Sequence, residues 1–302
     1  MKLGIVGTGR AAAHLGQALA ALGEAPVALG GRDPERTAAL ARRWGLAAST
    51  PADVLAQADW VVLAVRDEAI APLCASLPWM SRHVALHLSG ATSLRALDAA
   101  RAAGAQVAGF HPLQLLADPQ PTAAAARAAW AGIRIGIEAE GAVAEALMGL
   151  ARRLGAEPLA LDGAQRAAYH AAANAAASGL LAPLDLAARL CGEALGVPPD
   201  EALRALLPLA EGALRAARER GLVGALSGPM ARGDAAVLQA HVQALGARAG
   251  PDQTQTQPQA DQALYLALMR ALLPLAAATG RMGEPACAAL RDALDQGTKS
   301  LR

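Results

Sequence analysis

The segment that most constrains the fold of this chain is a glycine-containing turn close to its N-terminus. The short apolar run Leu3-Gly4-Ile5-Val6 predicts a buried strand, which leads into Gly7-Thr8-Gly9-Arg10-Ala11-Ala12 and then into a helix that ends near Leu22. In the pattern G-x-G-x-x-A the first glycine makes a tight turn, and the second lets the backbone approach a pyrophosphate. The small third residue lets the helix pack on the strand, so that the helix N-terminus faces the anion. The pattern alone is weak, but a strand before it and a helix after it indicate a dinucleotide-binding turn. The residues expected to contact the cofactor there are Gly7, Thr8, Gly9, Arg10 and Ala11.

Strand and helix signals continue to alternate as far as about residue 160. Asp33 before Pro34, and Thr50 before Pro51 with Asp53 to follow, are typical helix starts. This alternation predicts an α/β Rossmann domain over residues 1–160, built on a doubly wound parallel sheet. Strand signals vanish after Gly163, so residues 161–302 are expected to form an all-α domain. Further strands are predicted at 27–29, 60–65, 83–88, 106–110 and 133–137, and later helices at 164–190, 200–220, 234–245 and 261–278.

Composition limits the class of partner and the compartment. The net charge of +1 gives no electrostatic reason to expect nucleic acid or an anionic membrane surface. The 3 cysteines are widely spaced, which is typical of reduced thiols in the cytoplasm. The most apolar long window, 167–188, contains His170, Asn174, Pro183 and Asp185, and a bilayer would accept these only at a high cost. We therefore expect a soluble, cytoplasmic protein. Residues 251–258 are polar and of low complexity and predict a surface loop.

The end of the second predicted strand favours NADP over NAD. An NAD enzyme usually carries Asp or Glu at this point to bond the ribose 2′-hydroxyl. This chain has Gly30-Gly31-Arg32 instead, and Arg36 follows one helical turn later. Two guanidinium groups suit a 2′-phosphate, so we expect Arg32 and Arg36 to clamp NADP(H). The alternatives are that both arginines are ordinary surface charges, or that Asp33 serves an NAD ribose.

Polar residues follow the next predicted strands. Ligands of open α/β sheets lie outside the carboxyl ends of the strands. Val65, Ser89 and His111 stand at such ends, so we expect all three to line the cofactor crevice. His111 is favoured as a functional residue, whereas Ser89 is equally explained as part of a Ser-Gly turn. His83 and His87 have a spacing that suggests a metal pair, but on one strand they would lie ~13 Å apart at ~3.3 Å per residue, so no metal is expected.

The helical half adds a second group of candidates. His170, Asn174 and Ser178 fall at i, i+4 and i+8, on one face of an alanine-rich helix. Such a polar stripe must be hydrogen-bonded, and a substrate or a neighbouring helix would serve equally well. Arg232 suits a carboxylate or phosphate, or else a structural ion pair, and Asp234 is expected to cap a helix.

Four motifs in order resemble one bacterial family. They are Ser89-Gly90, His111-Pro112-Leu113-Gln114, Tyr169-His170-Ala171-Ala172-Ala173 and Ser227-Gly228-Pro229-Met230-Ala231-Arg232-Gly233-Asp234. The family joins a Rossmann-like NADP-binding domain to a helical C-terminal domain of unknown function, DUF2520. The likeness runs from Met1 to about Ala278 and departs at Ser178, where the family usually has Asn. The wider group includes pyrroline-5-carboxylate reductase, 6-phosphogluconate dehydrogenase and the imine reductases. The resemblance implies NADPH-linked reduction and a homodimer formed through the helical domains, but it supplies no substrate.

Two functions are therefore carried forward. The first is an NADP(H)-dependent oxidoreductase that reduces a small C=N or C=O substrate, one that bears a carboxylate. Its catalytic candidates are His111, His170 and Ser89, and its substrate-binding candidates are Asn174, Ser178 and Arg232. An imidazole with its usual pKa near ~6.5 would suit proton transfer around neutral pH. The second is a regulatory or sensor protein that holds NADP(H) without turnover, because the sequence offers no obvious Lys or Tyr as proton donor.

Overall fold

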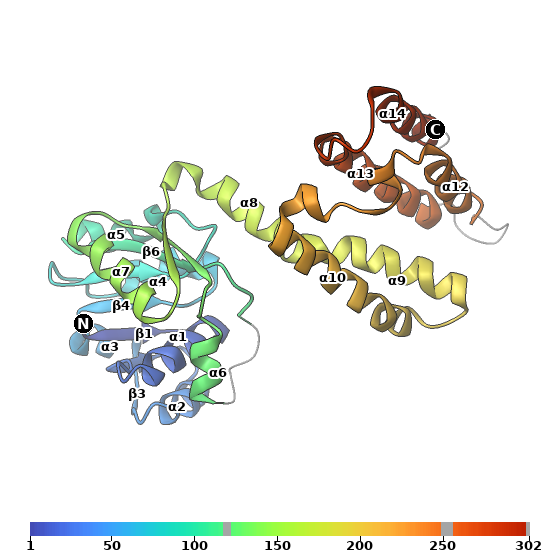
Figure 1. The fold of residues 1–302 in the computed structure, drawn as a ribbon. Helices are drawn as coiled ribbons and strands as arrows, with labels where there is room; N and C mark the ends of the chain where they lie inside the picture. The colour runs from blue at the N-terminus through green and yellow to red at the C-terminus, as the bar shows by residue number, and fades with distance from the viewer. Residues whose placement is uncertain (117–121, 249–255, 300–302) are drawn as a thin grey trace. The chain divides into compact units, whose positions relative to one another are not determined.

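The computed structural model of the protein describes residues 1–116, 122–248 and 256–299 (Figure 1). Most of the loop predicted at 251–258 lies outside these residues. The chain divides into two compact units, Met1–Ala175 and Ala176–Arg302. The sequence placed the boundary at residue 160, before the helix that carries Tyr169 and His170. In the structure the first turns of that helix belong to the sheet unit, for reasons given with the site below.

The first unit is built on one eight-stranded sheet with strands in the order β3-β2-β1-β4-β5-β6-β7-β8. The strands are β1 Leu3–Val6, β2 Ala28–Gly30, β3 Ala48–Ser49, β4 Trp60–Leu63, β5 Val84–His87, β6 Gln106–Pro112, β7 Arg134–Glu138 and β8 Glu157–Ala160. Every pairing from β3 to β6 is parallel. The predicted Rossmann sheet is thus confirmed.

The sheet departs from a purely parallel arrangement at β7, which pairs antiparallel with β6. The short helix α6, Ala123–Ala128, packs against α1 instead of crossing back over the sheet. The chain therefore enters β7 beside the end of β6, with Pro112 opposite Ile135. β8 then adds parallel to β7. Strands β3 and β8 were not predicted from the sequence, because one has two residues and the other is mostly exposed.

Helices cover both faces of the sheet, and their starts follow the local sequence. Asp33 accepts a hydrogen bond from the backbone N–H of Arg36, and Thr50 forms a capping box with Asp53, as predicted. The helices of this unit are α1 Arg10–Ala21, α2 Pro34–Arg42, α3 Pro51–Gln57, α4 Asp67–Ser76, η1 Leu94–Leu97, α5 Asp98–Ala102, α6, α7 Gly141–Arg153, η2 Gly163–Gln165 and α8 Arg166–Ala176.

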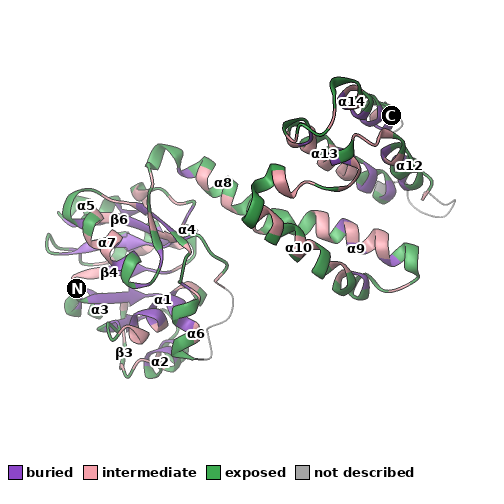
Figure 2. Ribbon diagram, in the orientation of Figure 1, coloured by how far each residue is buried: buried purple, intermediate pink, exposed green. Residues whose placement is uncertain are grey.

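Two apolar cores hold these layers together (Figure 2). Ile5 and Val62 point into the core under α1 and α7, whereas Val6 and Val61 point into the core under α3, α4 and α5. A strand that is buried on both faces of a sheet needs a continuous run of apolar residues, and β1 and β4 have such runs. Packing on both faces of the sheet sets the positions of the residues at its strand ends.

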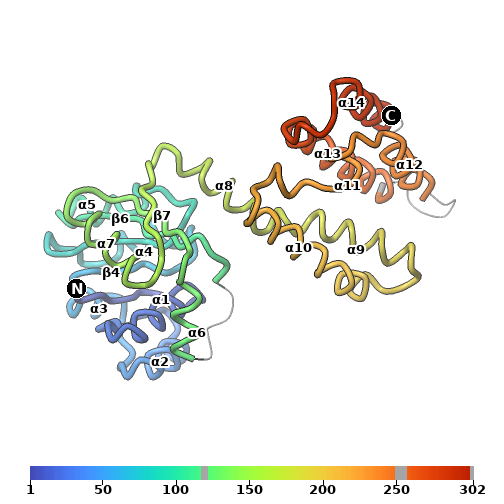
Figure 3. Tube along the Cα trace, in the orientation of Figure 1, coloured from blue at the N-terminus to red at the C-terminus, as the bar shows by residue number. Residues whose placement is uncertain are grey.

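The described residues of the second unit form helices and connecting turns, without a strand. The helices are η3 Ser178–Leu180, α9 Leu181–Leu195, α10 Pro199–Ala225, α11 Gly228–Arg232, α12 Ala235–Gly246, α13 Thr256–Ala278 and α14 Glu284–Lys299. Figure 3 follows the chain through them. The sequence did not predict α14.

The single helix predicted at 164–190 is wrong, because the chain leaves helical geometry at Ala177 (ψ −92°) before η3 and α9 begin. Pro183 explains this break, since it donates no hydrogen bond to the carbonyl of Gly179 and its ring would clash with that carbonyl. Ser178 therefore does not continue the helical face of His170 and Asn174.

A buried carboxylate ties the helices of the second unit together. Asp261 on α13 is only 1% exposed, and it contacts Arg189 of α9 at 2.5 Å and Arg248, which follows α12, at 2.8 Å. Burial alone would raise the pKa of Asp261, but hydrogen bonds from Arg189, Arg248 and Gln257 outweigh it and hold the pKa below its ordinary value. The stabilisation is therefore present above the pKa of the unfolded chain and is lost as the pH falls through the folded value.

We predict that Asp261→Asn lowers the free energy of unfolding by about 3 kcal/mol, because two arginines lose their buried partner. Thermal and denaturant unfolding of the full chain measures this. Asp295→Asn serves as the control, since Asp295 is 63% exposed in its ion pair with Arg270 and should cost less than ~1 kcal/mol. Equal losses in the two variants would contradict the proposed role of Asp261.

Candidate active site

The turn between β1 and α1 has the geometry that the glycine pattern predicts. Gly7 has φ +132°, and a Cβ there would lie 2.1 Å from the carbonyl oxygen of Ala64. Ala12, the small third residue, is fully buried. A Cβ at Gly9, in contrast, would meet no protein atom within 4 Å. Packing therefore explains Gly7 and Ala12 but not Gly9, whose open side suits the approach of a ligand.

Gly9 is also the N-cap of α1 and offers no side-chain cap. The first N–H groups of a helix have no partner within the helix, and the helix dipole adds positive potential there. Thr8 is half-buried beside this turn, and Arg10 and Ala11 form its helical side. The arrangement fits the pyrophosphate of a dinucleotide.

The end of β2 carries two unpaired arginines. Arg32 and Arg36 are exposed, and neither forms an ion pair with any residue that the structure describes. Asp33 is occupied as a helix cap, since its carboxylate accepts from the N–H of Arg36 at 3.1 Å. Gly31 is required by packing, because a Cβ there would lie 2.5 Å from Thr37 Oγ1 and 2.9 Å from Thr8 Cγ2. The local charge thus favours a phosphate over a ribose hydroxyl.

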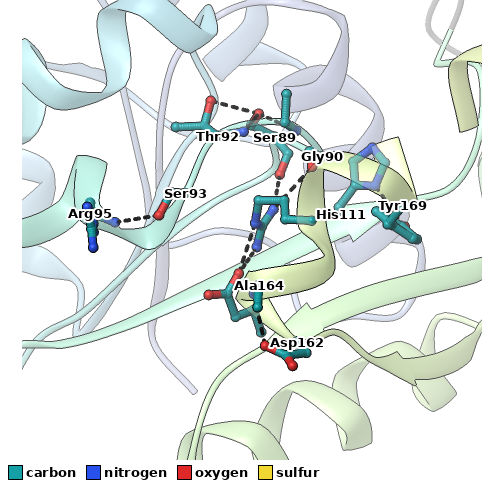
Figure 4. Close-up of polar contacts among 12 residues, drawn as sticks. Ser89, Gly90, Thr92, Ser93, Arg95, His111, Asp162, Ala164 and Tyr169 are labelled. Atoms are coloured by element: carbon teal, nitrogen blue, oxygen red, sulfur yellow. Dashed lines mark hydrogen bonds and ion pairs between the residues drawn. The ribbon is translucent and has the colours of Figure 1, made fainter. Parts of the chain in front are cut away.

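Val65 and Ser89 follow β4 and β5 at the same edge of the sheet, and Ser89 forms a tight turn (Figure 4). Its hydroxyl donates to Thr92 Oγ1 at 2.9 Å and accepts from the backbone N–H groups of Ala91 and Thr92 at 3.2 and 2.9 Å. The Ser89 hydroxyl therefore donates and accepts its hydrogen bonds within its own turn. The geometry therefore supports the turn interpretation of Ser89 over direct chemistry.

Two imidazoles meet above the glycine of this turn. A Cβ at Gly90 would lie 2.7 Å from His111 Nε2 and 2.9 Å from His170 Cδ2. The ring centroids of His111 and His170 are 6.4 Å apart. His111 lies on β6 and is half-buried, whereas His170 lies on α8 and is exposed. The structure therefore brings together the two histidines that the sequence proposed independently.

Tyr169 joins this group, although the sequence assigned it no chemistry. Its hydroxyl lies 2.9 Å from His111 Nδ1, and the two rings are nearly perpendicular (Figure 4). The phenol reaches His111 because residue 136 on β7 is glycine, where a Cβ would stand 2.8 Å from the hydroxyl oxygen. Gly136 is the register partner of His111.

Arg166 is the second site residue that the sequence missed. The residue is 3% exposed. Its guanidinium donates from Nε to Glu138 at 2.9 Å and from Nη1 to the carbonyls of Ser89 and Gly90 at 3.0 and 3.4 Å. Gly109 leaves the space for it, since a Cβ there would lie 2.8 Å from Nη2. These bonds attach the start of α8 to the sheet and explain why the first unit extends to Ala175.

Burial and neighbouring positive charge change the acid–base behaviour of the site. Burial, followed by the charges of His170 and Arg166, lowers the pKa of His111 to about 4. Burial and Arg166 likewise lower the pKa of the enclosed His87 to about 4. Burial raises the pKa of Tyr169, while Arg166 partly opposes that rise. The expectation that His111 titrates near 6.5 is therefore wrong, and its ring is neutral at pH 7.

The remaining substrate candidates are all exposed side chains. Asn174 is exposed on α8, and Ser178 and Arg232 are exposed in the second unit. Arg232 ends α11 and forms no ion pair within the described residues. Asp234 caps α12 by accepting from the N–H of Val237 at 3.2 Å, as predicted.

Two family models match the chain. Residues 2–86 match the family described as NADP oxidoreductase, coenzyme F420-dependent. Residues 133–272 match a domain of unknown function, DUF2520. No curated protein matches the chain. The chain thus combines an NADP oxidoreductase domain with a DUF2520 domain, which confirms the resemblance and the cofactor NADP(H).

Several solved structures share the fold at low sequence identity. A Bacteroides fragilis protein named provisionally as an NADP oxidoreductase is 23% identical with a TM-score of 0.66, and the match covers 89% of this chain and 96% of that chain. An imine reductase from Pseudomonas sp. is 18% identical with a TM-score of 0.61, over 97% and 98% of the two chains. A pyrroline-5-carboxylate reductase from Coxiella burnetii is 16% identical with a TM-score of 0.56, over 99% and 98%.

We predict that Arg32→Ala weakens NADPH binding about tenfold or more and leaves NADH binding nearly unchanged, because a charge-assisted contact typically contributes ~1.5–3 kcal/mol. Fluorescence titration with both cofactors measures this. Arg42→Ala, which removes the same charge at the other end of α2, is the matched control and should leave both affinities unchanged. If Arg32→Ala weakens NADPH and NADH equally, no phosphate clamp exists at this position.

Proposed function

We propose that the protein is an NADPH-dependent reductase of a small C=N or C=O compound. The observation that carries this proposal is the convergence of His111 and His170 over Gly90, at the strand-end edge next to the dinucleotide-binding turn. NADPH, when bound, supplies a hydride from C4 of its nicotinamide. The remaining requirement is a group that polarises the acceptor and delivers a proton to its nitrogen or oxygen.

His111 is the proposed polarising group. Its Nε2 packs against Gly90, 2.7 Å from the point that a Cβ there would occupy, so this nitrogen lies at the turn that follows β5, where the substrate is expected to meet the cofactor. Because the pKa of His111 is about 4, the ring acts as a neutral hydrogen-bond donor and not as an imidazolium. His170, on the other side of Gly90, is the second candidate for the proton, whereas Ser89 holds the turn that carries Gly90.

The substrate class rests on the chemistry of the site and on the named reductases of the same fold. Pyrroline-5-carboxylate reductase and imine reductase are named for C=N substrates. Arg232, exposed and unpaired among the described residues, would bind a substrate carboxylate, and Asn174 and Ser178 would contribute hydrogen bonds. The sensor alternative was based on the lack of an obvious Lys or Tyr as proton donor. The hydroxyl of Tyr169 contacts His111, which weakens that argument.

The protein is proposed to form a homodimer through the helical unit. Most of the large apolar side chains that are exposed in the described chain lie on or beside α9 and α10. They are Leu180, Leu181, Leu195, Leu207, Leu209, Leu214, Leu222 and Val223. Apolar surface of this extent is typical of an interface. A second copy of the chain is the simplest partner for it.

A membrane is the other partner that such a surface suggests. The segment Gly163–Leu195 is long and apolar enough to cross a bilayer by length and composition, and 11% of its most apolar window is buried. However, the break at Ala177 leaves helices of 11 and 15 residues on either side. A bilayer needs ~20 consecutive helical residues, so neither helix suffices. We infer a cytoplasmic protein, consistent with the three free cysteines.

We expect NADPH oxidation in a screen of cyclic imines, 2-oxo acids and aldehydes, with His111→Ala as the matched variant. The variant should lower kcat by about 100-fold or more, since it removes the proton donor, and NADPH should bind normally. If no compound of these classes oxidises NADPH, the reductase proposal fails. If His111→Ala keeps near-full turnover, His111 is not the proton donor, and His170 becomes the residue to test.

The pH dependence follows from the neutral state of His111. The groups that face its ring are Asp67, His170 and Arg166, together with the phenol of Tyr169. Because the lowered pKa keeps the ring neutral above about pH 5, kcat should stay level from there to about pH 8. A fall in kcat through pH ~6.5 as the pH rises would instead identify an imidazolium as the acid.

Sedimentation of the full chain should show a dimer at micromolar concentration. Leu209→Glu should dissociate it, because Leu209 is 73% exposed on α10 and the variant places a charge in the proposed interface. Leu115→Glu is the control, since Leu115 is equally exposed but lies in the sheet unit. A monomeric wild-type protein would rule out the dimer.

A further inference from the structure

The contact between Tyr169 and His111 determines which nitrogen of the imidazole carries the proton. A neutral imidazole has one N–H donor and one acceptor nitrogen, so His111 exists as either an Nδ1–H or an Nε2–H form. Its Nδ1 lies 2.9 Å from the Tyr169 hydroxyl. Hydrogen positions follow from the hydrogen-bond network, so the network is the basis for the choice.

The network favours the Nε2–H form. If Nδ1 carried the proton, it would donate to the phenol oxygen, and the Tyr169 O–H would have no acceptor among the described residues. If Nε2 carries the proton, the Tyr169 O–H donates to the Nδ1 lone pair and both groups are satisfied. The second arrangement gives the half-buried phenol a partner for its O–H within the protein, so we favour it.

The Nε2–H form places its donor on the side of the ring away from Tyr169, at the Ser89–Gly90 turn. Nε2 packs against Gly90, 2.7 Å from the point that a Cβ would occupy, and only glycine allows the imidazole to come this close to the turn after β5. The ring therefore accepts at Nδ1, on the side of Tyr169, and presents its donor on the side of Gly90.

The position of Tyr169 is itself fixed by two features of the fold. Arg166, one helical turn earlier on α8, is attached to Glu138 and to the carbonyls of Ser89 and Gly90. Gly136, opposite His111 on β7, leaves space for the phenol hydroxyl. Tyr169 thus approaches Nδ1 from a rigid support.

We propose that Tyr169 is a positioning residue that holds neutral His111 in its Nε2–H form and so makes it the donor to the substrate. This inference rests on the proposed reductase function. As the hydride reaches the substrate carbon, Nε2 gives its proton to the substrate nitrogen or oxygen, and Nδ1 takes the proton of Tyr169. The imidazole stays neutral throughout; once the product has left, Nδ1 returns its proton to the phenolate of Tyr169 and Nε2 takes a proton from solvent, which restores both groups.

The test is nitrogen NMR of the full-length protein labelled with ¹⁵N-histidine, at pH 7 and without substrate. His111→Gln assigns the His111 signals. The wild-type protein should show His111 with the proton on Nε2 alone, and Tyr169→Phe should show both forms in exchange. Tyr265→Phe is the matched control, because Tyr265 contacts His241 Nδ1 at 2.7 Å in the other unit. It should change the His241 signals and leave those of His111 as they are.

Turnover provides the second readout. Tyr169→Phe should lower kcat about tenfold or more while the dissociation constant of NADPH stays within about twofold. A proton on Nδ1 in the wild-type protein, or unchanged His111 signals and kcat in Tyr169→Phe, would overturn the proposal. An Nε2–H signal without reduction of any imine or carbonyl would leave the assignment of the proton intact and disprove the reductase function instead.

Discussion

The candidate site depends on the buried guanidinium of Arg166. An arginine that is 3% exposed must have partners for its charge and its donors, and it finds Glu138 at the end of β7 and two carbonyls in the turn after β5. Removing one partner from a buried ion pair is strongly destabilising, so a substitution of Arg166 or of Glu138 alone is expected to destabilise the fold. It places Tyr169 and His170 beside His111 and keeps the Ser89–Gly90 turn in position. The residues that handle the proton in our account are therefore arranged by one that takes no part in the chemistry.

Glycines on the sheet let these side chains approach the backbone. A Cβ would collide with the two imidazoles at Gly90, with Arg166 at Gly109, and with the Tyr169 hydroxyl at Gly136. In each case the colliding atom belongs to the site and stands 2.6–2.9 Å from the point that the Cβ would occupy. Bulkier residues would still form strands, but they would push α8 and His111 away from the sheet. The glycines thus permit the close contacts that Arg166 then fixes.

Local signals in the sequence were enough to predict most of the sheet unit. The strand–turn–helix at Gly7 and the helix caps at Asp33 and Thr50 depend on residues only a few positions apart, and the structure has them as predicted. The break at Ala177 was missed because the alanine-rich composition outweighed the signals of Gly179 and Pro183.

The contacts that define the site could not be read in the same way. Arg166 pairs with Glu138 and Tyr169 with His111 across long stretches of sequence, and no periodicity reports such pairings. The dipeptide Tyr169-His170 stood out in the sequence. Its contact with His111, however, exists only because α8 packs against the sheet. The low pKa of His111 likewise follows from burial and from neighbouring charges, neither of which is local in sequence.

A crystal structure of the protein with NADPH would show where the nicotinamide meets the protein. We predict that the pyrophosphate lies at Gly9, that the 2′-phosphate lies between Arg32 and Arg36, and that C4 of the nicotinamide lies beside His111 at the Ser89–Gly90 turn. A nicotinamide that lies elsewhere, or that is separated from His111 by protein atoms, would contradict the account.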